Sequence, residues 1–185
     1  TRYAFEKLTT NLSLNPALAE RITAVQVFIS DQNTDHSTLQ AYASWKIKAG
    51  SGDVHPVHGG TLTSGLENDA VPAVTLDSFC AEQDIKRLDY IKIDTDGHEF
   101  KVLKGGYETI KQFQPVIIFE AGLYVFREQN LTFSAFYKLF KEQGYQLYNS
   151  KNNKIINMDN YTKQIPMYYT TDIIALPSSM KAGTK

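Results

Sequence analysis

The sequence has little of several features that would define its class. Only one of its 185 residues is cysteine, so no internal disulfide can form, which favours a reducing compartment such as the cytoplasm. No apolar run approaches the roughly 20 residues that span a bilayer, and the N-terminus shows no signal-peptide pattern. Nineteen basic against twenty acidic residues give no overall electrostatic attraction to nucleic acid or to an anionic membrane. We therefore expect a soluble protein with no nucleic-acid and no membrane partner.

The chain does have the composition of a globular domain. It contains 42% hydrophobic and 21% charged residues, and its length suits a single core, so we expect residues 1–185 to form one domain. The stretch from Tyr42 to Pro72 is the exception, because it is rich in glycine and has no hydrophobic periodicity. We expect a long loop there.

Strand and helix patterns alternate along the rest of the chain. Helical spacing at Tyr3–Leu12 precedes a β-branched run at Ile22–Ile29, which is typical of a buried strand. After the loop we expect a short helix with Asp77 as N-cap. There follow a strand at Leu88–Asp94, two helical pieces broken at Gly105-Gly106, a strand at Pro115–Glu120, a helix at Phe133–Phe140, and strands at Tyr145–Tyr148 and Thr171–Leu176. The alternation predicts an α/β fold, with a mostly parallel sheet and helices on both faces.

Polar residues stand at the ends of three of these predicted strands. Ser30 and Asp31 follow the first, Asp94 and Asp96 end the second, and Glu120 ends the third. In parallel sheets, ligands bind at the carboxyl ends of the strands. This convergence predicts the functional site.

The spacing of Asp94 and Asp96 has two interpretations. Both carboxylates would point to the same side if extended geometry continued through Thr95. Close carboxylates repel, and a cation, a basic ligand, a shared proton or helix-terminal amides normally relieve that repulsion. The alternative is that Asp96 only caps the next helix and that Asp94 faces solvent.

Two neighbouring residues are expected to be structural. Glu99 falls in the first turn of the predicted helix, where a carboxylate interacts favourably with the amide end. Cys80 has no activating partner in the sequence, so we expect a core residue and no nucleophile.

Three segments together carry a family resemblance. They are Asp89–Glu99 (DYIKIDTDGHE), Val102–Gly106 (VLKGG) and Pro115–Glu120 (PVIIFE). The set resembles the FkbM-like family of S-adenosylmethionine-dependent methyltransferases, whose pattern is Lys-Ile-Asp-Val-Glu-Gly-x-Glu, a Val-Leu-Lys-Gly helix end and a strand closing in Glu. Asp96 stands where Glu is more usual, and His98 stands where a small residue is common.

The resemblance implies a Rossmann-like class I methyltransferase sheet and S-adenosylmethionine as cofactor. It favours methyl transfer to a small-molecule or glycan hydroxyl, such as that of a sugar, with Ser30 and Asp31 near the adenine end of the cofactor. Asp94, Asp96 and Glu120 would then line the acceptor side. The acceptor hydroxyl loses a proton as it attacks, so a carboxylate or His98 is a suitable base. Asp94 is the first candidate, with Asp96 and Glu120 positioning the acceptor or a metal.

The sequence contains no G-x-G-x-x-G segment. The resemblance therefore implies that the first two strands of the family sheet, with their glycine-rich loop, lie before Thr1. The chain would correspond to the C-terminal two-thirds of the domain, either as a piece of a longer protein or as a degenerate member without the cofactor half. We expect weak S-adenosylmethionine binding and self-association through an exposed sheet edge.

Two other functions remain open at this level. Asp94-Thr95-Asp96 after a hydrophobic strand also resembles the D-x-D of nucleotide-sugar glycosyltransferases, whose acids hold a divalent cation at the diphosphate. The absent glycine-rich loop also fits a non-catalytic interaction module. Cofactor binding separates the methyltransferase from the module, and tight binding of Mn²⁺ with a nucleoside diphosphate would favour the glycosyltransferase.

Overall fold

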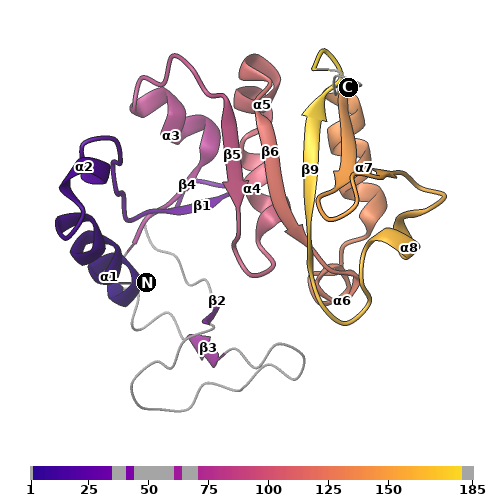
Figure 1. Cartoon of the computed structure of the whole chain (residues 1–185), viewed down its shortest axis with the longest axis horizontal. Helices are drawn as coiled ribbons and strands as arrows, with labels where there is room; N and C mark the ends of the chain where they lie inside the picture. The colour runs from indigo at the N-terminus through magenta and orange to yellow at the C-terminus, as the bar shows by residue number, and fades with distance from the viewer. Residues whose placement is uncertain (1, 35–40, 44–60, 64–70, 181–185) are drawn as a thin grey trace. The chain divides into compact units, whose positions relative to one another are not determined.

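A computed structural model describes residues 2–34, 41–43, 61–63 and 71–180 of the chain (Figure 1). The chain divides into two compact units, Thr1–Val74 and Thr75–Lys185. No helix within the described ranges is both long and apolar enough to cross a membrane.

The first unit contains short helices and short paired strands. They are α1 (Arg2–Ser13), α2 (Pro16–Ala19), β1 (Phe28–Ser30), β2 (Ala41–Ala43), β3 (Thr61–Thr63) and β4 (Ala73–Thr75), which ends at the boundary with the second unit. The helix predicted at the start of the chain is confirmed as α1. β2 and β3 pair antiparallel inside the segment predicted as a loop at Tyr42–Pro72, so that prediction is wrong at these strands. Most of the remaining segment lies outside the described residues.

The strand predicted at Ile22–Ile29 is wrong over most of its length. Only Phe28–Ser30 forms a strand, and it pairs with β4, which has three residues. Ile22 and Val25 are 45% and 46% exposed. A strand needs a partner for its backbone hydrogen bonds, and β4 is too short to supply one for the whole β-branched run.

The second unit contains a five-stranded sheet with its helices. In chain order its elements are α3 (Leu76–Glu82), β5 (Tyr90–Ile93), α4 (Glu99–Gly105), α5 (Tyr107–Phe113), β6 (Val116–Ala121), α6 (Leu123–Glu128), α7 (Phe133–Glu142), β7 (Tyr145–Asn149), β8 (Ile155–Ile156), α8 (Tyr161–Gln164) and β9 (Thr171–Pro177). The strands and helices predicted for this part of the chain are confirmed, with small shifts at their ends. The sequence pattern gives no prediction of α6, β8 and α8.

The sheet is mixed, so the prediction of a mostly parallel sheet is wrong. Its strand order is β5-β6-β9-β7-β8, and only the β5 and β6 pair is parallel. β9 is antiparallel to both of its neighbours, β6 and β7, and β8 is antiparallel to β7. The cause is the insertion of the last strand between β6 and β7. As a consequence, the beginning of β9 meets the end of β6.

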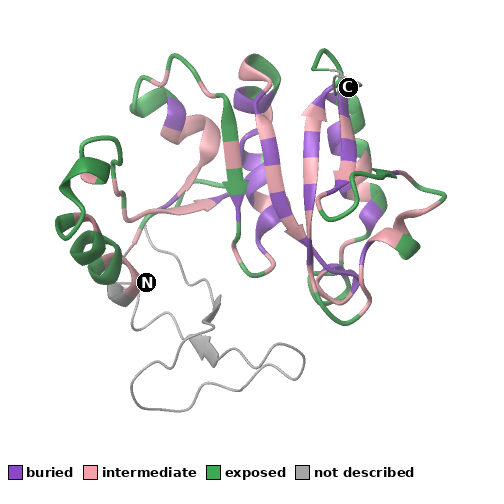
Figure 2. Cartoon of the chain, viewed as in Figure 1, coloured by how far each residue is buried: buried purple, intermediate pink, exposed green. Residues whose placement is uncertain are grey.

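The core of the second unit lies on one face of this sheet. Alternate residues of β6, β7 and β9 are buried, as Figure 2 shows. Phe119 of β6 stacks on Phe136 and Phe140 of α7, with ring centroids 5.7 and 5.2 Å apart, and α4 and α7 lie behind the sheet in Figure 1. Residues of the opposite face, such as Ile118, are only partly buried. Among the described residues of the second unit, the helices named here lie on one face only.

The helix break predicted at Gly105-Gly106 is confirmed. α4 ends at Gly105 and α5 begins at Tyr107. A Cβ atom on Gly106 would lie 2.7 Å from Cδ2 of Leu76. The approach of α3 therefore favours glycine here, because any larger residue would require the Leu76 side chain to shift.

Asp77 has a different role from the predicted one. The N-cap of α3 is Thr75, whose Oγ1 accepts a hydrogen bond from the Ser78 amide at 3.0 Å. The Asp77 carboxylate instead accepts hydrogen bonds from the amides of Thr109 at 2.8 Å and Glu108 at 3.3 Å. Asp77 therefore stabilises the first turn of α5 and is not the N-cap of its own helix.

Candidate functional site

Two predicted carboxylates meet at one edge of the five-stranded sheet. β5 and β6 are parallel, with Ile93 opposite Phe119, so Asp94 and Glu120 both follow at the carboxyl ends of neighbouring strands. β9 begins at the same edge and places Asp172 opposite Glu120. The structure thus places Asp94 and Glu120 at one edge, as the sequence predicted, and adds the carboxylate of Asp172.

The turn after β5 is held by Glu99. Oε1 of Glu99 accepts hydrogen bonds from the amide and hydroxyl of Thr95, both at 2.9 Å, and from the amide of Gly97 at 3.3 Å. Glu99 is only 3% exposed. The predicted structural role is confirmed, since this carboxylate satisfies the donors of the turn.

Asp96 lies within this turn in a left-handed conformation. Its φ is 49°, and the φ of Gly97 is 103°, so the chain leaves the extended conformation at Asp96. The N-cap position of α4 belongs to His98. The alternative in which Asp96 caps this helix is therefore wrong.

The pKa of Asp96 is raised above its ordinary value. Partial burial among the surrounding elements is the largest cause, followed by the negative charges of Asp94, Glu120 and Glu99. The side chain nevertheless remains accessible to solvent. A carboxylate that binds a proton more readily than usual and can be reached from outside suits a general base.

Asp94 is exposed at the end of β5. Its side chain is 62% exposed, and one of its oxygens lies 3.7 Å from Nζ of Lys92. The Lys92 ammonium is closer to Asp172, at 2.7 Å. Asp94 therefore does face solvent, as one interpretation held, while it shares a cation with the last strand.

Glu120 is fixed by the segment that precedes β9. The Thr170 hydroxyl donates to Oε1 of Glu120 at 2.5 Å. The charges of Asp96 and Lys92 lie nearby. Glu120 is partly buried. One oxygen is thus held by the protein, and the other can accept a hydrogen bond from a bound hydroxyl group.

Tyr124 is a member of the site that the sequence analysis missed. Burial raises the pKa of its hydroxyl, and the charges of Glu120, Glu128 and Asp96 raise it further, with a smaller effect from Glu99. The Tyr124 ring also lies close to Gly122, because a Cβ there would be 3.1 Å from Cε1. Its position four residues after the strand-ending Glu120 is the one signal that the sequence offers.

The other predicted site residues are His98, Ser30 and Asp31. His98 is buried at the beginning of α4 and makes no side-chain cap. Ser30 is buried, and its hydroxyl donates to Oδ1 of Asp31 at 3.5 Å. Ser30 and Asp31 belong to the first unit, whereas the carboxylates belong to the second.

The described residues fit S-adenosylmethionine only in part. The turn at Ser30 and Asp31 offers polar atoms for one end of such a cofactor. The sequence contains no G-x-G-x-x-G segment, which is the kind of glycine-rich loop that allows a nucleotide cofactor to approach the backbone. Within the part of the chain that the structure describes, no three His, Cys, Asp or Glu side chains are grouped so that they could hold a metal ion.

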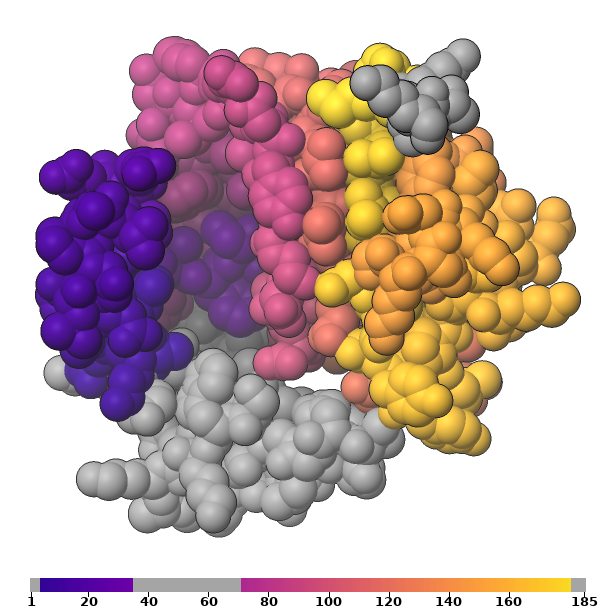
Figure 3. Space-filling view, viewed as in Figure 1, coloured from indigo at the N-terminus to yellow at the C-terminus, as the bar shows by residue number. Residues whose placement is uncertain are grey.

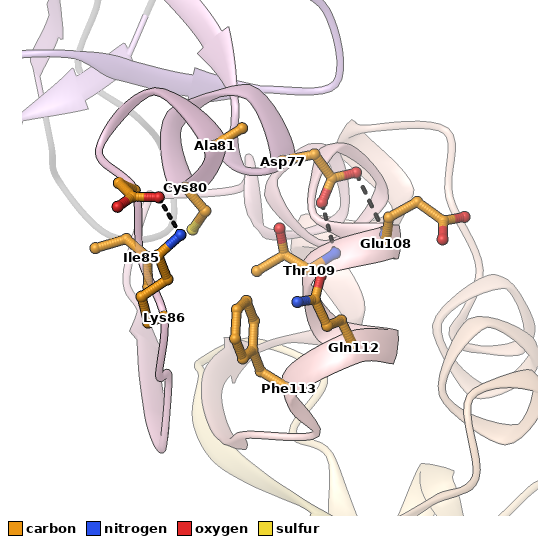
Figure 4. Close-up of a pocket in the computed structure, with 10 residues that line it drawn as sticks. Asp77, Cys80, Ala81, Ile85, Lys86, Glu108, Thr109, Gln112 and Phe113 are labelled. Carbon is orange, nitrogen blue, oxygen red and sulfur yellow. Dashed lines mark hydrogen bonds and ion pairs between the residues drawn. The ribbon is translucent and has the colours of Figure 1, made fainter.

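A cavity of about 270 Å³ lies elsewhere in the second unit, next to α3, α5 and the residues before β5 (Figure 4). The Asp77 carboxylate at its wall is already bonded to the amides of α5. The pKa of the Cys80 thiol is raised, mainly by burial. A hydrogen bond with Thr109 lowers this pKa in part, and the Asp77 charge raises it slightly. A thiol with a raised pKa is a poor nucleophile, so Cys80 is a core residue, as predicted.

Comparison with known families gives one match. A family model described as the methyltransferase FkbM domain matches residues 2–147, which include β5, β6 and their carboxylates and end before β9. No curated protein and no solved structure gives a significant match. Because the family model covers most of the chain, the resemblance seen in the three sequence segments is confirmed, and the chain belongs to the FkbM methyltransferase family.

Proposed function

We propose that the protein is an S-adenosylmethionine-dependent O-methyltransferase that acts on the hydroxyl of a sugar or a similar small molecule. The observation that carries this proposal is the meeting of Asp94, Asp96 and Glu120 at one edge of the sheet in a member of this family. The cofactor, when bound, supplies an electrophilic methyl group. The residues of the chain have to orient the acceptor hydroxyl and accept its proton.

We assign the role of proton acceptor to Asp96. Its raised pKa, its accessibility and the turn fixed by Glu99 all suit a positioned base. Asp94, the first candidate from the sequence, is paired with Lys92, which suits orientation of the methyl acceptor. Glu120 is held by Thr170 through one oxygen. Its other oxygen can accept a hydrogen bond from the hydroxyl of the methyl acceptor.

A non-catalytic methyltransferase-like module is the second candidate. It is favoured by the lack of a G-x-G-x-x-G segment in the sequence. The D-x-D glycosyltransferase has no comparable support, because the family match covers the Asp94–Asp96 segment.

The proposal is tested by transfer of a radiolabelled methyl group from S-adenosylmethionine to a panel of methyl pyranosides and simple alcohols. We expect Asp96→Asn to lower kcat by about 10²- to 10⁴-fold, the range for loss of a general base. Asp94→Asn should lower it less. Asp89→Asn is the matched control, because Asp89 is an exposed partner of Arg87 at the other end of β5 and should leave turnover unchanged.

Two outcomes would contradict the proposal. Equal turnover of Asp96→Asn and the parent would remove Asp96 from the reaction. Absence of methyl transfer to every hydroxyl compound, with the cofactor bound, would favour the non-catalytic module.

A further inference from the structure

The segment that leads into β9 reaches the functional site from a distant part of the chain. β9 runs antiparallel to β6, so that Glu120 pairs with Asp172 and Ala121 with Thr171. Figure 3 shows β6 and β9 side by side on the visible surface. Residues 166–172 lie beyond the end of the family match at residue 147, so the family assignment says nothing about their role.

Two side chains of this segment bind the residues of the site. The Thr170 hydroxyl donates to Glu120 at 2.5 Å. Asp172 accepts a hydrogen bond from the Lys92 ammonium at 2.7 Å, and Lys92 in turn lies 3.7 Å from Asp94. The segment therefore sets the position of one site carboxylate directly and of another through a shared cation.

The same segment presents two aromatic rings to solvent. Tyr168 and Tyr169 are 72% and 70% exposed, whereas Tyr145 in the same unit is only 1% exposed. The backbone is tied to the end of β6, because the Pro166 carbonyl accepts from the Leu123 amide at 2.9 Å and a Cβ on Gly122 would lie 3.0 Å from the Tyr169 carbonyl oxygen. The two rings thus stand close in the chain to the bond that fixes Glu120.

The chemistry of this neighbourhood selects among acceptors. An exposed tyrosine ring offers an apolar face and a polar hydroxyl, and carboxylates accept hydrogen bonds from hydroxyl groups. The negative charges of Asp94, Asp96 and Glu120 disfavour an anionic acceptor. A neutral ring that carries several hydroxyls and an apolar C–H face meets both requirements.

We propose that Tyr168 and Tyr169 form an acceptor subsite that contacts the C–H face of a neutral saturated ring, such as a pyranose, and that Thr170 positions Glu120 toward its hydroxyls. This inference rests on the proposed function, because it assigns the ring to the same acceptor. Thr170 is a positioning residue, and the two tyrosines determine specificity.

The test measures binding of a panel of methyl pyranosides by saturation-transfer NMR, with sorbitol as an open-chain polyol and glucose 6-phosphate as an anion. We expect binding of at least one methyl pyranoside and weaker binding of sorbitol and of the phosphate ester. The double variant Tyr168→Ala/Tyr169→Ala should weaken pyranoside binding about tenfold, within the range for loss of an aromatic contact. Tyr168→Phe/Tyr169→Phe should retain it.

Three matched variants sharpen the test. Tyr90→Ala removes another exposed tyrosine, at the opposite end of β5 from the site, and should leave binding unchanged. Thr170→Val should weaken pyranoside binding, and Thr170→Ser, which keeps the hydroxyl, should restore it. Unchanged thermal midpoints would show that the variants fold.

The result that would overturn the inference is binding of no pyranoside, or equal binding by the parent and the Tyr168→Ala/Tyr169→Ala variant. This readout needs no methyl transfer, so it is separable from the proposed function. Methyl transfer to a pyranoside with an unchanged KM in the double variant would overturn the subsite and leave the methyltransferase intact. Pyranoside binding that depends on the tyrosines, without any methyl transfer, would retain the subsite and contradict the methyltransferase.

Discussion

Two sets of carboxylates in the second unit are used in opposite ways. Asp77 and Glu99 accept hydrogen bonds from backbone amides, and Glu99 is almost completely buried. Asp94, Asp96 and Glu120 have one another as charged neighbours and remain at least partly accessible. The difference shows that the hydrogen-bond partners of a carboxylate, more than its place in a motif, decide whether it stabilises the fold or remains available at the sheet edge.

The largest effect on stability should come from Glu99. Glu99→Ala removes the acceptor of three donors in the Thr95–Gly97 turn, so we expect the free energy of unfolding to fall by about 3 kcal/mol. Glu99→Gln, which keeps one acceptor oxygen, should cost less. Urea denaturation at neutral pH measures both. Glu108→Ala, at an exposed position on α5, is the control, and a loss in Glu99→Ala no greater than in this control would contradict the structural role.

Asp77 should have the next largest effect. Asp77→Ala leaves the Glu108 and Thr109 amides without their acceptor, and we expect a loss of about 1 to 2 kcal/mol, as for removal of a helix cap. Lys86→Ala, in the exposed segment after α3, removes only a surface ion pair with Asp84 and should change stability much less. Denaturation curves of equal midpoint for the two variants would argue against the bond to α5.

Substitution of Asp96 should raise the stability of the fold, whereas substitution of Glu99 or Asp77 should lower it. Its pKa in the folded protein lies above the ordinary value of 3.8, so the folded state favours the protonated acid. That contribution to stability is present below the unfolded pKa and is lost as the pH rises through the folded pKa. Asp96→Asn imitates the protonated acid, so we expect its thermal midpoint at neutral pH to rise by about 1–3 °C.

The same variant provides its own control in acid. Near pH 3 the parent is largely protonated at Asp96 on this account, so the gain in thermal midpoint should disappear there. A thermal midpoint of Asp96→Asn below that of the parent at neutral pH would place Asp96 with Asp77 and Glu99 as a supporting acid.

Lys92 should give the smallest effect on stability. Its ion pairs with Asp172 and Asp94 lie at the surface, where such pairs contribute about 0 to 1 kcal/mol. Lys92→Met should therefore change the free energy of unfolding by less than about 1 kcal/mol. Added salt should reduce the difference further. A loss as large as that of Glu99→Ala would show that this pair supports the fold.

Much of the second unit could be predicted from local sequence. β5 and β6 are β-branched runs that end in acids, and a parallel pair places those acids at one edge. The helix break at Gly105-Gly106 also follows from local composition. These features depend on residues that are close together in the chain.

The remaining features depend on pairings that local sequence does not contain. Thr170 reaches Glu120 across 50 residues, and Asp172 reaches Lys92 across 80, because β9 inserts antiparallel between β6 and β7. Apolar patterning predicts that Thr171–Leu176 is a strand but not which strands it joins. The strand prediction at Ile22–Ile29 is wrong for the same reason, because among the described residues the only strand that pairs with this run is the short β4.

A ¹³C NMR titration of the Asp96 side-chain carboxyl tests most directly whether burial and the neighbouring carboxylates raise its pKa so that it can act as a base. We predict that Asp96 in the parent titrates above 3.8, and that Asp94→Asn and Glu120→Gln each lower its pKa, because each removes a negative charge nearby. Asp89→Asn, at the other end of β5, should leave it unchanged. A pKa of Asp96 at or below 3.8, or one that neither substitution at the sheet edge alters, would contradict the account.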